Sequence, residues 1–166
     1  MSDVTVGKSH NNSIKYSYIA GFLDGDGSLM LQIKKRADGK NKIRFMAIIC
    51  FYQDTRHEKN LLWIQKVLGM GYLSHRNDGM SELRINGFST VGEILKKLIS
   101  NIRFKKIQAK ALLESCTILS KTKFNMLNRK QLAKLVDLIL VIQNENYVTK
   151  KKRTRSELFQ VLGLTP

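Results

Sequence analysis

Two long segments of the chain alternate apolar and polar residues with a period of two, which is typical of strands that bury one face. In the first, Leu29, Leu31 and Ile33 share one side. The second runs from Lys42 to Gln53, and its apolar side comprises Ile43, Phe45, Ala47, Ile49 and Phe51. Asp38-Gly39 lies between the two segments and supplies a turn, so they are predicted to form a hairpin with a longer loop.

A second, shorter hairpin is predicted from strands at about residues 70–76 and 81–86, because Asn77-Asp78-Gly79 between them is a turn sequence. Helical spacing of apolar residues fills the segments before and after it. Two of these segments begin with the spacing of a capping box. These pairs are Thr55 with Glu58 and Thr90 with Glu93.

The elements occur in the order helix, two strands, helix, two strands, helix, followed by further helices. Helices are predicted at about residues 17–23, 55–68, 90–99, 107–120 and 129–145, with a short last helix opened by Thr154 and Glu157. We therefore expect an α+β fold in one domain that spans residues 1–166. Within it we expect a flexible N-terminus at 1–13, a core at 14–120, and C-terminal helices with a basic segment at 121–166.

The charge of the chain points to a polyanionic partner. Among 166 residues, 29 Lys and Arg stand against 13 Asp and Glu, which gives a net charge of +16. Neutralising phosphates releases counterions, so a protein this basic is suited to nucleic acid. An anionic membrane surface is the rival partner, although no apolar run is long enough to span a bilayer and no signal peptide is recognisable. Cys50 and Cys116 form no C-x-x-C pair, and we expect them to be buried free thiols.

The candidate chemistry lies in the segment Tyr18-Ile-Ala-Gly-Phe-Leu-Asp-Gly-Asp-Gly-Ser28. Asp24 and Asp26 stand beside glycines that let the backbone bend, and carboxylate and carbonyl oxygens are suited to Mg²⁺ or another hard cation. An EF-hand loop that began at Asp24 would need Gly and Glu where Leu29 and Lys35 stand, so that interpretation fails. A plain Asp-Gly turn explains the same residues without a metal.

Small residues in the same segment indicate either a close contact with another helix or ordinary core packing. Gly21 and Gly25 are four residues apart and would share one face if the helix continued that far. Spacing alone favours ordinary core packing.

This segment, followed by long alternating basic strands, resembles the motif of the LAGLIDADG homing endonucleases. The match covers residues 18–28, the element order matches the core of that family through about residue 105, and the C-terminal helices are similar to those of its single-motif homodimeric members. The resemblance implies the LAGLIDADG fold: an α-β-β-α-β-β-α core with a curved antiparallel DNA-binding sheet. It also implies a homodimer with C2 symmetry, in which the motif helices of two chains touch.

The resemblance assigns roles by position. Asp26 matches the metal-binding acid, and Gly25 matches the residue that offers a carbonyl oxygen to Mg²⁺ or Mn²⁺. Gln53 and Lys105 match polar and basic residues around the scissile phosphate, and His57 stands at a third position that the family usually makes basic, with Arg56 beside it. Without the resemblance, Gln53 and His57 would be ordinary residues at the start of a helix, and Lys105 one of many surface lysines. The expected dimer interface comprises Ala20, Gly21, Asp24 and Gly25.

The polar side of the predicted strands is expected to contact DNA, because a β-ribbon can enter the major groove. A solvated sheet face is the alternative. A basic run near the C-terminus is expected to contact phosphates. The expected DNA-binding residues are Gln32, Lys34, Arg36, Lys42, Arg44, Met46, Ser74, Arg76, Glu82, Arg84, Lys150, Lys152, Arg153 and Arg155.

The resemblance thus implies a metal-dependent endonuclease that makes a staggered double-strand break with 3′ overhangs in a long, near-palindromic DNA site. Two other functions of the same fold stay open: an RNA maturase that helps an intron fold, and a DNA-binding regulator that does not cleave. Family members act where their introns reside, so we expect an intracellular protein of an organelle or an archaeal cell.

Overall fold

The computed structural model describes the backbone of residues 4–35, 43–147 and 151–164, and side chains from residue 12 onward within those ranges. Its core has the predicted order. The elements are α1 (Val4–Asp26), β1 (Gly27–Lys35), β2 (Ile43–Asp54), α2 (Lys59–Leu68), β3 (Tyr72–His75), β4 (Met80–Asn86) and α3 (Phe88–Leu98). The C-terminal elements are α4 (Lys106–Lys121), α5 (Arg129–Glu145) and α6 (Arg155–Val161), with short 3-10 helices η1 (Thr55–His57) and η2 (Phe124–Met126). The predicted α+β fold class is therefore confirmed.

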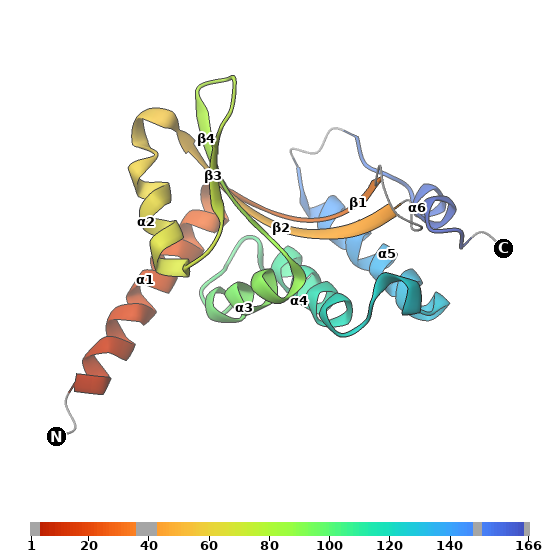
Figure 1. The fold of residues 1–166 in the computed structure, drawn as a ribbon, viewed down its shortest axis with the longest axis horizontal. Helices are drawn as coiled ribbons and strands as arrows, with labels where there is room; N and C mark the ends of the chain where they lie inside the picture. The colour runs from red at the N-terminus through yellow and green to blue at the C-terminus, as the bar shows by residue number, and fades with distance from the viewer. Residues whose placement is uncertain (1–3, 36–42, 148–150, 165–166) are drawn as a thin grey trace.

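The four strands form one antiparallel sheet in the order β1-β2-β4-β3. Figure 1 shows the sheet curving across the molecule, with α3, α4 and α5 gathered below it and the upper face left open by these helices. The predicted turn at Asp38-Gly39 lies outside the described residues. At the second hairpin, Gly79 has a φ of 77°, which is suited to glycine in a turn.

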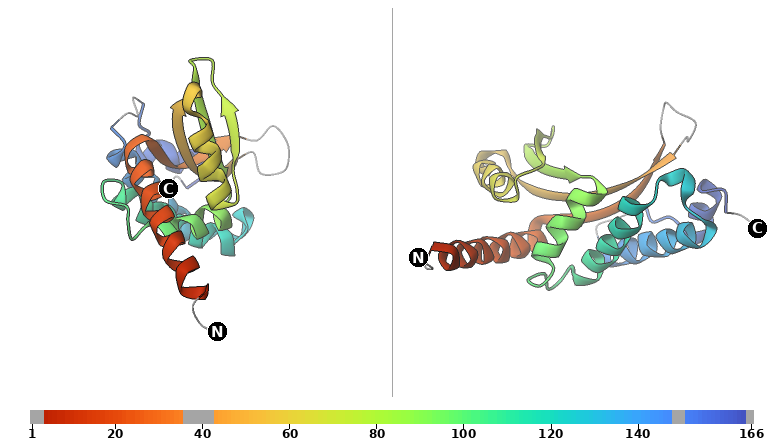
Figure 2. Two further views of the ribbon diagram at one scale, coloured as in Figure 1. Left: turned by 90° about the vertical axis from the view of Figure 1, so that its left-hand side faces the viewer. Right: turned by 60° about the horizontal axis from the view of Figure 1, so that its bottom comes forward.

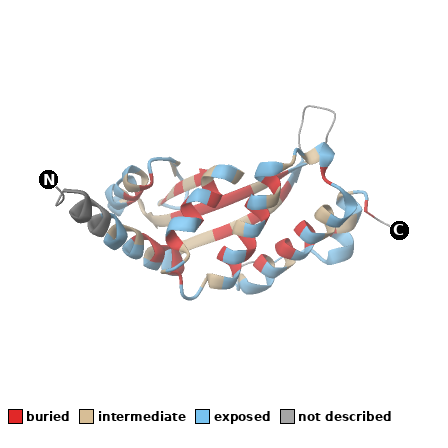
Figure 3. Cartoon of the chain, turned by 90° about the horizontal axis from the view of Figure 1, so that it is seen from below, coloured by how far each residue is buried: buried red, intermediate tan, exposed pale blue. Residues whose placement is uncertain are grey.

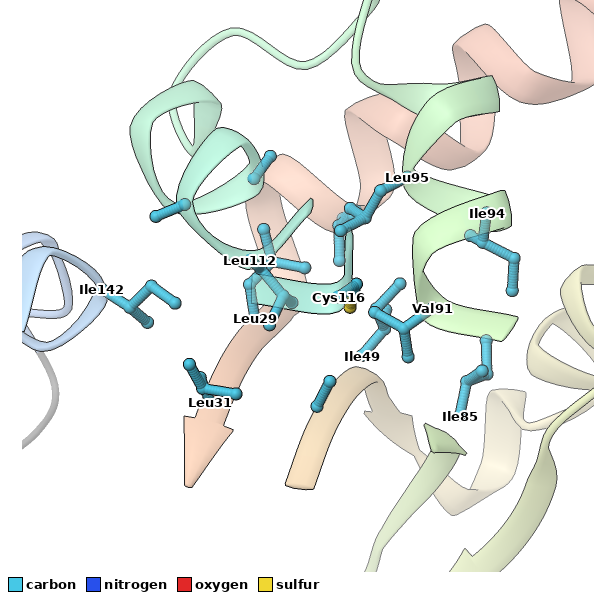
Figure 4. Packing of buried hydrophobic residues seen from close by; sticks show 14 of the residues in the cluster. Leu29, Leu31, Ile49, Ile85, Val91, Ile94, Leu95, Leu112, Cys116 and Ile142 are labelled. Atoms are coloured by element: carbon cyan, nitrogen blue, oxygen red, sulfur yellow. The ribbon is translucent and has the colours of Figure 1, made fainter. Parts of the chain in front are cut away.

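The core lies between the lower face of the sheet and the helices. The alternating residues predicted to face inward do so: Leu29, Leu31, Phe45, Ala47, Ile49 and Phe51 are buried in one cluster. Figure 4 shows Leu29, Leu31, Ile49 and Ile85 from the strands meeting Val91, Leu95, Leu112 and Cys116 from α3 and α4. Figure 3 shows buried residues along the strands and on the helices packed against them. This packing fixes the orientation of the open face.

Helix α1 begins at Val4, well before the predicted start at Ser17, so residues 4–13 that we expected to be a flexible segment have helical backbone. The polar composition of this part gave no apolar pattern to detect. Helix extension needs none, since adding a residue to an existing helix avoids the cost of nucleation and no proline interrupts the run. Figure 2 shows the N-terminal part of α1 projecting from the body of the molecule.

Two predicted capping boxes are wrong. The side chain of Asp54 accepts from the N–H of Arg56 and caps η1, while Thr55 and Glu58 bond to Ser81 instead. At α3, the N-cap position is occupied by Gly87, and Thr90 lies inside the helix. At η1 the two side chains bond to Ser81 across the fold, whereas at α3 the helix begins at Phe88, before Thr90 could act as its cap. The capping box of Thr154 and Glu157 is confirmed at α6.

The two cysteines are buried and free, as predicted. None of the helices in the described part of the chain combines the length and the hydropathy that crossing a bilayer requires.

Candidate functional site

The end of α1 runs directly into β1, and the turn between them leaves no room for a side chain at Gly27. A Cβ at that position would lie 2.8 Å from the carbonyl oxygen of Leu23. Glycine is therefore required there for steric reasons. The close turn places Asp26, the last residue of α1, at the start of the sheet with its side chain exposed.

Asp24 has the opposite environment, because its carboxylate points into the protein. It accepts hydrogen bonds from the backbone N–H groups of Arg103 at 2.6 Å, Phe104 at 3.3 Å and Lys105 at 3.0 Å. Backbone donors to a carboxylate form strong charge-assisted bonds. Asp24 therefore fastens the segment before α4 to the end of α1. The carboxylate thus stabilises its own chain and is not presented at the dimer interface, where we expected it.

Lys105 is the residue that this anchor positions. Its ammonium donates to the carbonyl oxygens of Asp24 and Gly25, the latter at 3.2 Å. Partial burial lowers the pKa of Lys105 from its usual value, and the negative charges of Asp24 and Asp26 oppose that effect. The ammonium thus lies beside the terminal carbonyls of α1, where a cation is favoured by the helix dipole.

These groups line a cleft of about 670 Å³ at the junction of α1 and the sheet. Asp26, Gly25, Gln53 and Lys105, all singled out from the sequence, share it. The amide oxygen of Gln53 accepts from the N–H of Asp54 at 2.9 Å, which fixes its position at the end of β2. Four residues separated by up to 80 positions in sequence are therefore brought to one place.

His57 is not among the residues that line this cleft in the described part of the chain. It is exposed in η1. Its neighbour Arg56, considered as a substitute, holds the carboxylate of Asp54 through two hydrogen bonds of 3.0 and 2.9 Å, and these bonds lower the pKa of Asp54 to about 2. Arg56 is thus occupied in an ion pair.

The exposed face of α1 carries the two motif glycines. A Cβ at Gly21 or Gly25 would meet no other atom of the chain within 4 Å. Tyr18 and Ile14, on the same face by helical spacing, are each 60% exposed. Ala20, which we expected on this face, is instead fully buried in the core of its own chain, because position 20 is rotated by about 100° around the helix from Gly21.

The donor set for a metal is incomplete in one chain. In the ranges that the structure describes, no group of three or more His, Cys, Asp or Glu side chains is gathered to hold a metal ion. Asp26 and the Gly25 carbonyl are oxygen donors of the kind Mg²⁺ prefers. One carboxylate and one carbonyl fit a hard cation only if further oxygens come from elsewhere.

The open face of the sheet carries most of the described residues that we expected to contact DNA. The register pairs Gln32 with Met46 and Lys34 with Arg44, which places these side chains on one face. Glu82 and Arg84 lie on β4, where Glu82 is paired with Ser74 of β3. Arg76 follows that strand and lies over the ring of Tyr52 at 5.9 Å.

The basic C-terminal segment is partly engaged within the chain. Lys152 donates to the carbonyl of Asn144, and the backbone N–H of Arg153 donates to Gln143. Arg155 bonds Asp137 at 2.9 Å and lies over the ring of Phe159. Arg155 is therefore tied to its neighbours in α5 and α6. The remaining candidates Arg36, Lys42 and Lys150 lie outside the described residues.

Sequence reasoning missed a hydroxyl pair in the cleft. The hydroxyl groups of Ser28 and Tyr52 are 3.1 Å apart. Burial is the main reason that the pKa of Tyr52 is raised to about 12, so the phenol keeps its proton at neutral pH. The pair could have been found from the sequence, because alternation places Tyr52 on the polar side of β2 and Ser28 is the last residue of the motif.

The family model described as LAGLIDADG endonuclease matches residues 19–119. The DNA endonuclease I-CvuI of Chlorella vulgaris is 36% identical over 113 residues, which are 68% of this chain and 70% of that protein. The DNA endonuclease I-CreI of Chlamydomonas reinhardtii is 26% identical over 140 residues, covering 84% and 83% of the two chains.

Solved structures agree over a larger share of the chain. The crystal structure of I-CvuI in complex with its target in the presence of Ca superposes with a TM-score of 0.81 at 29% identity, covering 95% of this chain and 99% of that one. The archaeal intron-encoded homing endonuclease I-Vdi141I, complexed with DNA, has a TM-score of 0.76 at 21% identity and supports the fold alone. It covers 90% of this chain and 95% of that one.

Proposed function

This chain belongs to the LAGLIDADG endonuclease family and is a homing endonuclease, and we propose that two copies of it assemble on DNA and cut both strands with the help of a divalent metal ion. The observation that carries the proposal is the half-complete oxygen site. Asp26 and the Gly25 carbonyl lie at the exposed end of a helix whose outer face has open space at Gly21 and Gly25. A second copy of the chain, placed with its α1 against this face, would supply the missing oxygen ligands.

The pairing surface is the glycine face of α1. Without side chains at Gly21 and Gly25, another helix can approach the backbone closely, and the exposed rings and alkyl groups of Tyr18 and Ile14 supply apolar area to bury. A two-fold axis between identical helices makes each contact self-complementary. The same axis brings the two Asp26 side chains together.

In the dimer, the residues that would hold the ion are Asp26 and the Gly25 carbonyl of each copy. A divalent ion bound there supplies charge stabilisation for the attacking and leaving oxygens of phosphodiester hydrolysis. Relatives in the family support this class of cofactor, since the I-CvuI complexes were determined in the presence of Ca or Mg. Mg²⁺ or Mn²⁺ is the ion we propose for this chain.

The other cleft residues act on the phosphate and the water. Lys105 offsets negative charge that develops at the scissile phosphate, and its ammonium is held within the same cleft as Asp26. Gln53 hydrogen-bonds the attacking water, because its side chain lies in that cleft and is fixed by its bond to Asp54. We assign His57 no contact with the reacting atoms, and we leave it the role of a surface residue near the DNA.

The open sheet face reads the target. Gln32, Lys34, Arg44 and Arg76 are donors suited to guanine or adenine edges in the major groove, while Lys152 and Arg153 contact phosphates. Each copy covers about one helical turn, ~10 base pairs, so the target is long and nearly palindromic. The two Asp26 residues meet between the half-sites, and cleavage across the minor groove leaves 3′ overhangs.

The test is cleavage of DNA that carries the insertion site of this chain's own reading frame. We expect a staggered double-strand break that requires Mg²⁺ and is lost in Asp26→Asn. Light scattering should report twice the 19.0 kDa of one chain. A stable monomer, or an Asp26→Asn variant that cuts like the wild type, would overturn the proposal. Tighter binding to intron RNA than to any duplex DNA would favour a maturase instead.

A further inference from the structure

The open face of the sheet contains one ion pair that is far less exposed than the others. The guanidinium of Arg84 donates from Nη1 to Oε1 of Glu82 at 3.0 Å, and the two side chains are 23% and 13% exposed. Among the other ion pairs of the described residues, at least one partner is 49% exposed or more. Exposed pairs contribute little, whereas partly buried ones hold a defined geometry.

A buried thiol completes this pair. Cys50 lies opposite Arg84 in the register of β2 and β4 and is fully buried. Its Sγ lies 3.4 Å from Oε1 of Glu82 and 3.9 Å from Nη1 of Arg84. Burial, and then the charge of Glu82, raise the pKa of Cys50 to about 12, so the thiol keeps its proton and donates it to the carboxylate. The oxygen that binds Arg84 therefore has two donors.

Glu82 is among the residues expected to contact DNA, and the base that a carboxylate is suited to read is cytosine. A carboxylate that reads cytosine must accept from the N4 amino group at the bottom of the major groove. Here Oε1 already accepts from Arg84 and Cys50, and only 13% of the side chain is exposed. Arg84 has four further N–H donors beyond the one that Glu82 takes, because a guanidinium carries five. The residue with donors to spare is Arg84.

We propose that Glu82 is a positioning residue that, together with Cys50, holds the guanidinium of Arg84 on the open face so that Arg84 reads a guanine in each half-site. Guanine is the base expected because its O6 and N7 acceptors match two N–H groups of a guanidinium fork. A held guanidinium loses less side-chain freedom when it binds DNA than a mobile one, which favours the correct base. This inference rests on the proposed DNA-binding function and gives Glu82 and Cys50 a positioning role in it.

The experiment selects preferred duplexes from a randomised library with the wild-type protein in Ca²⁺ buffer, and then measures binding to the selected duplex and its single-base variants. We expect Arg84→Met to lose the preference for guanine at one base pair of each half-site. Glu82→Gln should reduce discrimination at that same base pair by about tenfold, which corresponds to ~1.4 kcal/mol. The double variant should be no worse than Arg84→Met, since coupled residues are not additive.

Controls separate positioning from general damage. Cys50→Ser keeps a donor to Glu82 and should retain the preference, whereas Cys50→Ala should weaken it. Asp78→Asn removes a comparable but exposed partner from Arg76, whose ion pair measures 2.8 Å, and should leave the base pair read by Arg84 unaffected. Melting curves identify variants that do not fold, and Glu82→Asp replaces Glu82→Gln if the latter fails.

Two outcomes would overturn the inference. If Glu82→Gln changes a different base pair, at which the wild type prefers cytosine, then Glu82 reads that base itself. If neither Arg84→Met nor Glu82→Gln changes any base preference, the pair has no part in recognition. A wild-type protein that selects no sequence at all would count against the proposed function instead, so the two failures are distinguishable.

Discussion

Asp24 and Asp26 are separated by a single residue, yet they belong to two different parts of the molecule. Two positions along an α-helix are about 200° apart, so their side chains leave on nearly opposite sides. Asp24 turns inward and accepts three backbone N–H groups, while Asp26 turns outward into the cleft. The comparison shows how one short acidic motif supplies a scaffold on one face and chemistry on the other.

The largest expected effect comes from removing the outer carboxylate. Asp26→Asn should lower the cleavage rate by at least about 10³-fold, because loss of ~4 kcal/mol of metal-assisted stabilisation corresponds to that factor. The measurement is the single-turnover rate of double-strand cleavage in Mg²⁺. The melting temperature should stay close to that of the wild type, since Asp26 is exposed. If Asp26→Asn lost activity because it unfolds, Asp26 would have a structural role like that of Asp24, and the contrast between the two aspartates would fail.

Lys105 lies between the two regions, and its replacement should have the next largest effect. Lys105→Met should reduce cleavage by about 10²-fold, the cost of losing one group that stabilises transition-state charge. Binding to uncut DNA in Ca²⁺ buffer, measured by fluorescence anisotropy, should change much less. If binding and cleavage fall by the same factor, Lys105 contributes to affinity alone. Lys106→Met is a matched control, because the ammonium of Lys106 bonds to the carbonyl of Ile99 instead.

Asp24→Asn makes the same chemical change as Asp26→Asn on the inner face, and its main effect should be on stability. The backbone N–H groups of Arg103 and Lys105 would lose an ionised acceptor, which we expect to cost about 2–3 kcal/mol of unfolding free energy. That loss corresponds to a fall of roughly 5–10 °C in melting temperature for a chain of this size. An unchanged melting curve with abolished cleavage would mean that Asp24 takes part in the chemistry directly.

The smallest expected effect has a diagnostic sign. Gly21→Ala should stabilise an isolated helix by about 0.5–1 kcal/mol, and the added Cβ meets no atom of the chain within 4 Å. If a second α1 packs on this face, the same methyl group separates the helices and weakens the dimer. Sedimentation at decreasing concentration should therefore show earlier dissociation, while Asn12→Ala at another exposed position should show none. A dimer strengthened by Gly21→Ala would place the contact elsewhere.

The strands were predictable because one face of the sheet is buried. Alternation then places Leu29, Phe45 and Ile49 inside and fixes the opposite face at the same time. The start of α1 was not predictable, since the mostly polar sequence of its first half contains no apolar residues at helical spacing that a pattern could reveal. The family resemblance located Asp26, Gln53 and Lys105, which share one cleft, and their roles there remain predictions.

Side chains with long-range partners were the ones that local spacing misjudged. Glu58 has the spacing of a capping residue, yet its carboxylate bonds Ser81 and His75 across the fold. Ala20 is small enough for a close contact between helices, but its angular position on α1 turns it toward the core of its own chain. Glu82 has the chemistry of a base acceptor, and two neighbours on other positions of the sheet already use one of its oxygens. For Glu58, and for the contact of Glu82 with Cys50, the partner is distant in sequence and local spacing could not reveal it.

The hydrogen bonds between Asp24 and residues 103–105 also limit when the cleft can form during synthesis of the chain. Arg103 is 79 residues farther along the chain than Asp24, so the contact cannot exist until the ribosome has released most of the core. A contact between residues so distant in sequence closes a long loop, and the entropy cost of that closure must be met before the contact stabilises the chain. Lys105 consequently reaches the cleft only in a chain that already contains all four strands of the sheet. A nascent or truncated chain ending before residue 103 carries the acidic motif, but it lacks the lysine that a nuclease would direct at a phosphate.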